Sequence, residues 1–153
     1  MRVYRLVKAR HAGSPLDGSG AKTHGGRWNS KGVALVCTSE TVSLAALELL
    51  VHLHRSEVLS TYLLVSVELP DAGVMELDAA SLPGDWRRDP PPLSTAVLGD
   101  EWVAGGSSLA LAVPSALVPR QRNILINPAH PDFTAAAGTA RTEPFDFDPR
   151  LAR

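Results

Sequence analysis

The stretch TVSLAALELLVHLHR, from Thr41 to Arg55, decides the fold class of this chain. It is rich in Leu and Ala and contains neither Gly nor Pro, a composition that favours an α-helix. Ser39 or Thr38 can cap its start, because a short hydroxyl side chain accepts a hydrogen bond from the first free backbone N–H groups. Apolar side chains occupy most of the helix circumference, so we expect it to be largely buried.

Strand-like segments lie on both sides of this helix in the sequence. Val3 to Val7 and Val33 to Cys37 are short apolar runs bounded by turn residues, a pattern typical of β-strands. Thr61 to Leu69 alternates between apolar and polar residues and is stopped by Pro70, which predicts a strand buried on one side. The polar stretch from His11 to Gly26 predicts a long loop, and such loops often carry function.

The second half of the chain alternates loops with short elements. The run GDWRRDPPP, from Gly84 to Pro92, predicts a surface loop because its prolines lack the N–H donor that helices and strands need. Asp100 can cap a short helix that carries Trp102 and ends at the pair Gly105 and Gly106.

Two further strands and a tail follow. Leu109 to Val113 and Asn123 to Ile126 are apolar runs that predict strands. In the tail, residues 134–153, Phe145 and Phe147 alternate with acidic residues, so the tail forms either an edge strand or a loose end. The order of elements predicts one α+β domain over residues 1–153, with a buried helix against a short-stranded sheet.

The composition excludes several classes of protein. A chain of 153 residues can bury one sizeable core but is too short for two ordinary domains. Lys+Arg 15 against Asp+Glu 16 gives a formal charge of -1, so nucleic acid is not the expected direct partner. We find no signal peptide or membrane span, and expect a cytoplasmic protein. With Cys37 as the single cysteine and scattered histidines, we predict no disulfide and no metal site.

Glu48 is the first candidate for chemistry, because it lies in the middle of an apolar helix. A carboxylate among apolar neighbours needs a partner or a cleft, since desolvating an uncompensated charge is unfavourable. The alternative is a narrow solvent-facing stripe shared with His52 and Arg55.

Arg27 and Ser115 are the next candidates. Arg27 lies in GGRWNSKG, where glycines allow close approach of a ligand and the guanidinium suits phosphate or carboxylate, including that of Glu48. The alternative is a tight turn in which Arg27 packs on Trp28. Ser115, in VPSA, follows a predicted strand and can reach a cleft, or it can simply form a turn beside Pro114.

Five segments in a fixed order resemble the RES-domain family, named for an Arg, a Glu and a Ser. They are GGRWNSKG, AALELLVHL, GDEW, VPSA and NILINPAHPDF, and the resemblance extends from about Tyr4 to Phe133. Members are typically toxins encoded beside an Xre-type antitoxin. The resemblance implies a compact α+β fold related to ADP-ribosyltransferases, with a mixed sheet, and NAD as the substrate.

The resemblance also assigns roles to the candidate residues. The family's named Arg, Glu and Ser match Arg27, Glu48 and Ser115. Arg27 would bind the pyrophosphate or a neighbouring anionic group, and Glu48 would stabilise the ribosyl cation or orient the incoming nucleophile. Ser115 would hydrogen-bond the nicotinamide or its ribose. The resemblance also places Trp28, Asn29 and Cys37 among the residues that bind NAD.

Cys37 departs from the family pattern. The family usually has Tyr before the helix, in a VYTSE-like stretch, where this chain has VCTSE. Loss of ring stacking weakens NAD binding by about 1 kcal/mol, unless Trp28 or Tyr4 substitutes. By itself, a cysteine at such a place is more often a small buried apolar residue than a nucleophile.

Three functions remain open at this point. The first is NAD degradation by phosphorolysis or hydrolysis of the nicotinamide–ribose bond, with Lys31 or Arg5 contributing to a site for inorganic phosphate. The second is mono-ADP-ribosyl transfer to a protein. The third is an inactive module that only binds its antitoxin, against which the retained Arg27, Glu48 and Ser115 argue. In each case DNA contact would belong to the antitoxin.

Overall fold

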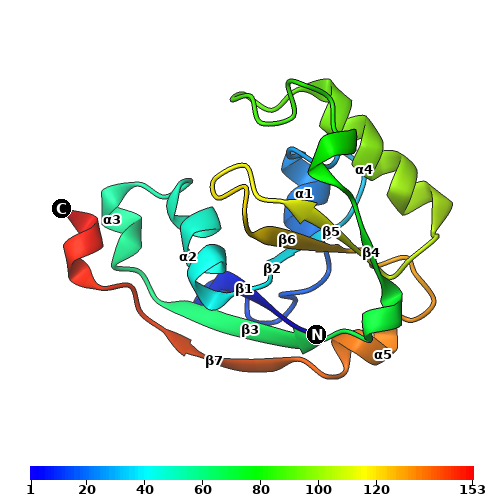
Figure 1. Cartoon of the computed structure of the whole chain (residues 1–153). Coiled ribbons are helices and arrows are strands. Elements are labelled where there is room, and N and C mark those ends of the chain that lie inside the picture. Colours follow the sequence, from blue (N-terminus) through cyan, green and yellow to red (C-terminus); the bar gives the residue numbers. More distant parts are fainter.

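Seven strands form one continuous sheet in the computed structural model, which describes residues 1–153 (Figure 1). Their order across the sheet is β4-β5-β6-β2-β1-β3-β7. Only β4 and β5 pair in parallel, whereas every other neighbouring pair is antiparallel. The predicted α+β fold with a mixed sheet is therefore confirmed. The strands are β1 (Arg2–Lys8), β2 (Val36–Ser39), β3 (Tyr62–Glu68), β4 (Val74–Glu76), β5 (Ala110–Pro114), β6 (Arg122–Ile126) and β7 (Arg141–Phe145).

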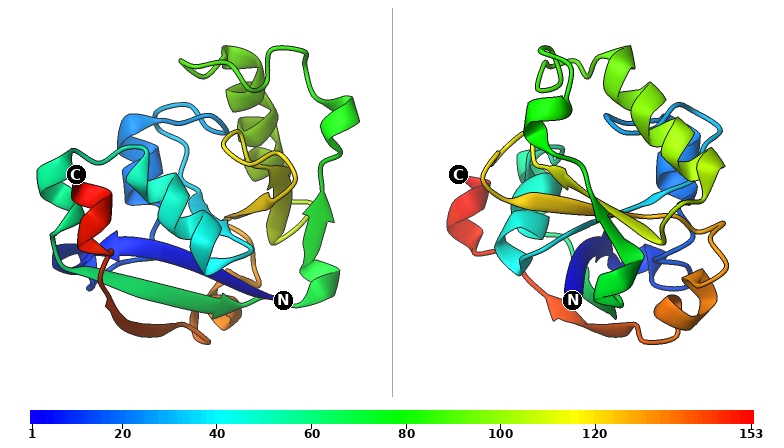
Figure 2. Two further views of the ribbon diagram at one scale, coloured as in Figure 1. Left: turned by 60° about the vertical axis from the view of Figure 1, so that its left-hand side comes forward. Right: turned by 45° about the vertical axis from the view of Figure 1, so that its right-hand side comes forward.

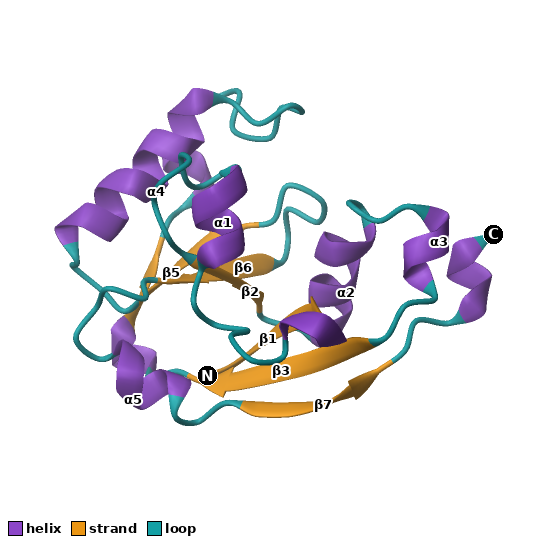
Figure 3. Cartoon of the chain, turned by 180° about the vertical axis from the view of Figure 1, so that it is seen from behind, coloured by secondary structure: helices purple, strands orange, loops and turns teal.

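Five α-helices surround the sheet. Seen from behind, α1 and α4 gather at one side of the molecule and α2 and α3 at the other (Figure 3). The helix α2 packs against β1 and β2, and α3 contacts the C-terminal 3-10 turn (Figure 2). None of the helices combines the length and apolar character needed to cross a membrane. The helices are α1 (Ser19–His24), α2 (Val42–Leu50), α3 (Arg55–Val58), α4 (Leu93–Gly105) and α5 (Phe133–Ala137).

The strand pair β1 and β3 buries both of its faces. On one face Val65 and Val67 join the largest apolar cluster, whereas on the other Tyr62 and Leu64 pack with Phe147 from the tail. The sequence predicts only one buried face for the segment 61–69. The second face is buried because α2, α3 and the tail cover it, a long-range effect that alternation within one strand does not encode.

The helix predicted over Thr41–Arg55 divides in two. The cap is Thr41, whose Oγ1 accepts from the backbone N–H of Leu44 (3.1 Å), so the predicted caps Ser39 and Thr38 are wrong. Both of those hydroxyls instead donate hydrogen bonds to β6 from within β2. The helix α2 ends at Leu50, and a separate short helix, α3, begins at Arg55.

Burial of α2 is confined to one face. Leu44 and Ala45 are buried against the sheet, but Leu47 and Val51 are 45% and 56% exposed. The helix therefore lies at the surface with its apolar turns only partly covered, which is less burial than the sequence predicts. Glu48, between the two exposed positions, is half-buried.

The remaining predictions hold with shifted boundaries. The strand predicted over 33–37 occupies Val36–Ser39, and the loop predicted over 11–26 contains the short helix α1. The helix before Gly105 and Gly106 starts at Leu93 and not after Asp100, whose carboxylate accepts from the backbone of Ser30 (2.8 Å). The tail forms the edge strand β7, and the chain before it forms α5.

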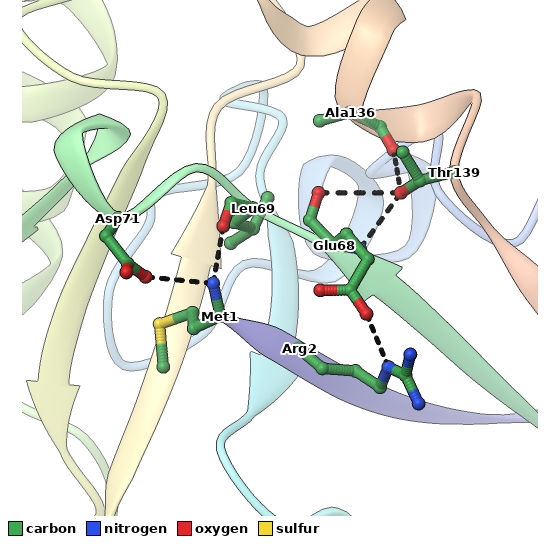
Figure 4. Close-up of polar contacts among 7 residues, drawn as sticks. All are labelled: Met1, Arg2, Glu68, Leu69, Asp71, Ala136 and Thr139. Carbon is green, nitrogen blue, oxygen red and sulfur yellow. Dashed lines mark hydrogen bonds and ion pairs between the residues drawn. The ribbon is translucent and has the colours of Figure 1, made fainter.

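A polar cluster joins the start of β1 to the end of β3 (Figure 4). The amino group of Met1 donates to the carbonyl of Leu69 (2.5 Å) and to Asp71 (2.9 Å), and Arg2 pairs with Glu68 (2.6 Å). Thr139, after α5, accepts from the backbone of Glu68 (2.9 Å). Most of these groups are exposed, so solvent screens their charges and each contact contributes little to stability. The cluster orders this end of the sheet, and none of its residues lines the candidate site.

Candidate functional site

Glu48 and Ser115, 67 residues apart in the sequence, meet in the structure. The Ser115 hydroxyl donates a hydrogen bond to Glu48 Oε1 (2.7 Å), and the Asn123 side-chain amide donates a second one to the same oxygen (2.6 Å). Glu48 comes from α2, Ser115 follows β5, and Asn123 lies in β6. The partner that a carboxylate in an apolar helix requires is therefore a pair of neutral donors.

Ser115 forms a turn as well as contacting Glu48. Its side chain is fully buried, and its Oγ accepts from the backbone N–H groups of Leu117 and Val118, both at 3.1 Å. A hydroxyl has one donor and two acceptor positions, and all three are used here. The structure bears out the turn, whereas the contact of Ser115 with a cleft stays a prediction, because the residue is fully buried and does not line the cavity described below. Its only hydrogen is committed to Glu48, so a hydrogen bond donated to a ligand would require release of that contact.

Asn123 is the residue that sequence reasoning missed. It is 5% exposed, and its Oδ1 accepts from the hydroxyl of Ser39 (2.8 Å) in the neighbouring strand β2. The signal was present as a polar residue at the start of the apolar run NILI. Polar residues at strand starts are common, and only the fold brings Asn123 to Glu48, 75 residues earlier in the chain.

A cavity of about 250 Å³ opens beside Glu48, between α2 and the strands β1 and β2. It is more apolar than polar and open to solvent on one side. Its volume is below the roughly 300–1,000 Å³ of pockets that enclose whole small molecules, so it can enclose only part of a larger ligand. Its lining consists of Tyr4, Arg5, Leu6, Cys37, Ser39, Ala45, Glu48, Leu49 and His52.

Arg5 is the cation that lines this cavity. One of its terminal nitrogens donates to the carbonyl of Cys37 (3.0 Å), while its Nε is buried without a hydrogen-bond partner. A buried donor with no partner is unfavourable by about 1–3 kcal/mol, and because the protein encloses this nitrogen, a ligand group reaches it only if the Arg5 side chain moves. Of the two cations that the sequence offers for a phosphate site, the structure brings Arg5 to the cavity, whereas Lys31 is exposed outside its lining.

Cys37 reaches the cavity surface, although the surrounding protein desolvates its thiol. Burial raises the pKa of Cys37 to about 11, the negative charge of Glu48 adds to the rise, and Arg5 opposes it. The thiol is therefore protonated near neutral pH, in line with the expectation that it is no nucleophile. Its side chain is accessible from the cavity and does not belong to the apolar core.

Tyr4 supplies a phenol ring to the cavity lining, which also contains the imidazole of His52. It lies on β1 beside β2, the strand that carries Cys37, and its replacement of the family's ring at that position stays a prediction. Trp28 is 6% exposed and packs with Trp102 away from the cavity. Asn29 is 3% exposed, and its amide donates to the backbone carbonyls of Ala21 and Val33. In this structure Trp28 and Asn29 shape their own loop, and their contact with NAD stays a prediction.

Arg27 fastens the proline-rich loop of residues 84–92. One terminal nitrogen donates to the carbonyls of both Trp86 and Arg88, each at 2.8 Å, and no hydrogen bond joins Arg27 to Glu48. Partial burial lowers the pKa of Arg27, while the charges of Asp89 and Glu48 raise it. Its interaction with Glu48 is thus a through-space attraction. The remaining guanidinium nitrogens have no partner in the chain and can meet an anion.

These residues define an α+β domain in which a serine and an asparagine hold the carboxylate of the helix residue Glu48 against the sheet. The chain belongs to the RES domain family, whose model matches residues 2–148. The family resemblance expected from the sequence is thereby confirmed, and several relatives of the chain are named as toxins.

Three of these relatives are similar over most of their length. "Toxin Res" of Yersinia enterocolitica is 44% identical over 99% of both chains. "Toxin Res" of Photorhabdus laumondii is 38% identical over 100% of this chain and 98% of its own. A Sphingobium protein named "Prs ADP-ribosylating toxin" is 37% identical over 90% of this chain and 87% of its own.

A solved structure shares the fold. It is the toxin–antitoxin complex of MbcT and MbcA from M. tuberculosis, matched with a TM-score of 0.74 and 17% identity. The match covers 99% of this chain and 86% of that one. At this identity the similarity concerns the fold, and it extends over the whole domain described above.

Proposed function

We propose that this chain is the toxin of a toxin–antitoxin pair and cleaves the nicotinamide–ribose bond of NAD. The observation that carries the proposal is the state of the Glu48 carboxylate. Two donors hold Oε1, at 2.7 and 2.6 Å, whereas Oε2 has no hydrogen-bond partner in the chain and belongs to a residue that lines a cavity. A fixed carboxylate with one free oxygen suits a reaction in which positive charge develops on a sugar.

The reaction needs few groups from the protein. The bond between the anomeric carbon and the nicotinamide nitrogen breaks, and its electron pair neutralises the charged ring, which leaves as nicotinamide. Positive charge develops on the ribose, where Glu48 Oε2 stabilises it. An oxygen of phosphate or water then bonds to the anomeric carbon, and water loses a proton in doing so. Arg27, Glu48 and Ser115 are the residues to which we assign catalysis, with Ser115 acting through its hydrogen bond to Glu48.

The cavity suits the nicotinamide riboside end of NAD. Its volume of about 250 Å³ is too small for the whole dinucleotide, so the adenosine part would lie outside it. Tyr4 can stack on a flat ring, which contributes about 1 kcal/mol. Arg5 contributes positive charge to the cavity lining, and Arg27 offers its free nitrogens to the pyrophosphate or to a phosphate acceptor. Cys37 would contact the ligand through its neutral thiol.

A second candidate is transfer of ADP-ribose to a protein. The name of the Sphingobium relative, 37% identical to this chain, favours it. The first half of that reaction is the same cleavage at Glu48, and only the acceptor differs. The open side of the cavity admits a small acceptor or a side chain of another protein equally well.

The proposal includes an antitoxin partner and a cytoplasmic location. The M. tuberculosis toxin that shares this fold was crystallised in complex with an antitoxin, which supports a protein partner for this chain. We take that partner to be of the Xre type, as in the family resemblance, with any DNA contact made by the antitoxin. The near-neutral charge of this chain agrees with such a division.

The test is incubation of the purified chain with NAD, with and without inorganic phosphate. Nicotinamide release and the ADP-ribose product are followed, with Glu48→Gln as the inactive control. Release that requires phosphate and yields ADP-ribose 1″-phosphate supports phosphorolysis. Phosphate-independent release supports hydrolysis, or transfer if label from NAD appears on protein of an added cell lysate. No release under any condition overturns the proposal and favours a module that only binds its antitoxin.

A further inference from the structure

The side-chain amide of Asn123 has only one orientation that satisfies its neighbours. Its Nδ2 lies 2.6 Å from Glu48 Oε1, and its Oδ1 lies 2.8 Å from Ser39 Oγ. An ionised carboxylate only accepts hydrogen bonds, so the NH2 group must face Glu48. The hydroxyl of Ser39 then donates to the remaining amide oxygen. Ser39, Asn123 and Glu48 form a directed chain of hydrogen bonds from β2 through β6 to α2.

The sheet fixes the first two members of this chain relative to each other. Ser39 and Asn123 are direct partners in the antiparallel register of β2 and β6, and they are only 2% and 5% exposed. Glu48 lies on the short helix α2, of which only one face is buried. A side chain on such a helix needs support from a rigid element to keep a defined orientation, and here the support comes from the strands beneath it.

We propose that Asn123, oriented by Ser39, is a positioning residue that determines which oxygen of Glu48 meets the substrate. Together with Ser115 it occupies Oε1, which leaves Oε2 for the reacting sugar. This role rests on the proposed function. Ser115 holds Oε1 from a turn whose hydroxyl also serves two backbone groups, whereas Asn123 holds it from within the sheet. The two donors therefore fix the carboxylate from two independent elements.

A purely structural role for Asn123 makes a different prediction. Loss of its amide leaves the hydroxyl of Ser39 without its buried acceptor, which lowers stability whether or not Glu48 acts in catalysis. Turnover by the folded protein would then be unchanged. A positioning role instead predicts a lower kcat at nearly constant KM for NAD, because a misoriented carboxylate stabilises the transition state less well but hardly changes the binding of NAD.

Two substitutions at position 123, one at position 39 and one matched control separate these roles. Asn123→Ala removes the donor, and Asn123→Asp keeps the shape but turns an acceptor toward Glu48. We expect both to lower kcat for nicotinamide release roughly 10- to 100-fold, with KM within about twofold. Ser39→Ala, which only frees the amide, should lower kcat by about threefold to tenfold. The control is Thr38→Val, which deletes a buried hydrogen bond to the carbonyl of Ile124 in the same strand pair and should leave kcat unchanged.

A double-mutant cycle tests whether Asn123 acts through Glu48. In a Glu48→Ala background, measured in single turnovers with enzyme in excess, Asn123→Ala should have no further effect on the rate of release. The proposal is overturned if Asn123→Ala lowers the residual rate by the same factor as in the wild type, or if Asn123→Asp keeps the wild-type kcat. Should Asn123→Ala not fold, Ser39→Ala and Asn123→Asp decide the question. Absence of release by the wild type is a separate result, which refutes the proposed function itself.

Discussion

Gly99 is the point where α4 touches the loop that carries Arg27 and Trp28, and replacing it tests that contact. A Cβ built at this position lies 1.6 Å from the carbonyl oxygen of Trp28 and 2.7 Å from its carbonyl carbon. Ordinary contact begins near 3.4 Å, so α4 and the loop would have to separate by almost 2 Å. Both obstructing atoms belong to the backbone and cannot turn away. Gly99→Ala should therefore destabilise the domain by about 3 kcal/mol or more, even after the gain of about 1 kcal/mol in helix propensity.

Thermal unfolding measures this effect. For a domain of this size, 1 kcal/mol corresponds to about 2–4 °C, so we expect the Tm of Gly99→Ala to fall by about 6–12 °C. Gly105→Ala is the matched control, because it lies in the same helix and a Cβ there meets nothing within 4 Å. It should raise the Tm slightly. Equal Tm values for the two variants would refute the packing of α4 against this loop.

Three further predictions concern the site. Ser115→Ala removes one donor from Glu48 and the acceptor of two backbone N–H groups. It should lower kcat for nicotinamide release roughly 10- to 100-fold and the free energy of urea unfolding by about 1–3 kcal/mol. Unchanged stability would contradict the turn contact. The rate at which iodoacetamide labels Cys37 should be low at pH 7 and rise about tenfold for each pH unit up to a pH near 11, because the raised pKa keeps the thiol protonated at lower pH. A rate that levels off below pH 9 would argue against desolvation of the thiol. Arg27→Ala should speed tryptic cleavage within residues 84–92, because it removes the donor that holds two carbonyls of that loop. An unchanged cleavage rate would show that other contacts hold the loop.

The part of the fold that local patterns determine could be predicted from the sequence. Alternation identified β3, apolar runs identified β5 and β6, and composition identified α2. The start of α4 at Leu93 was missed because its N-cap is Pro92 and not a side chain that accepts a hydrogen bond. Asp100 looks like a cap in the sequence but lies within the helix, where it accepts from the backbone of Ser30. That carboxylate serves a contact 70 residues away, which no local rule contains.

The candidate site was predictable to the extent that its residues were locally anomalous. Glu48 stood out as a carboxylate in an apolar helix and Ser115 as a hydroxyl after a strand, and the structure brings them together. Arg5 was a candidate only as one of two cations for a phosphate site, and Asn123 was marked only by its polarity at the start of an apolar run, since each lies in an ordinary strand. Their place at the site depends on strand order, which puts β1, β2 and β6 side by side although they are distant in the sequence.

Strand register explains how the site keeps its geometry on a small domain. Asn123 pairs with Ser39 on one side and with Val113 on the other, so β2, β6 and β5 present Ser39, Asn123 and, two residues after Val113, Ser115 at the same end of the sheet. Helix α2 starts directly after β2, so Glu48 lies at the same end of the sheet. Since side chains alternate with a period of two, a slip of one residue between β2 and β6 would turn Asn123 to the opposite face. Val36, Ile124 and Ile126 pack in the largest apolar cluster on one face of these strands, and Leu125 packs in a second cluster on the other face. A slip would exchange these side chains between two packed clusters, so the packing on both faces opposes it. The same packing that stabilises the core thus fixes the distance between the amide of Asn123 and the carboxylate of Glu48.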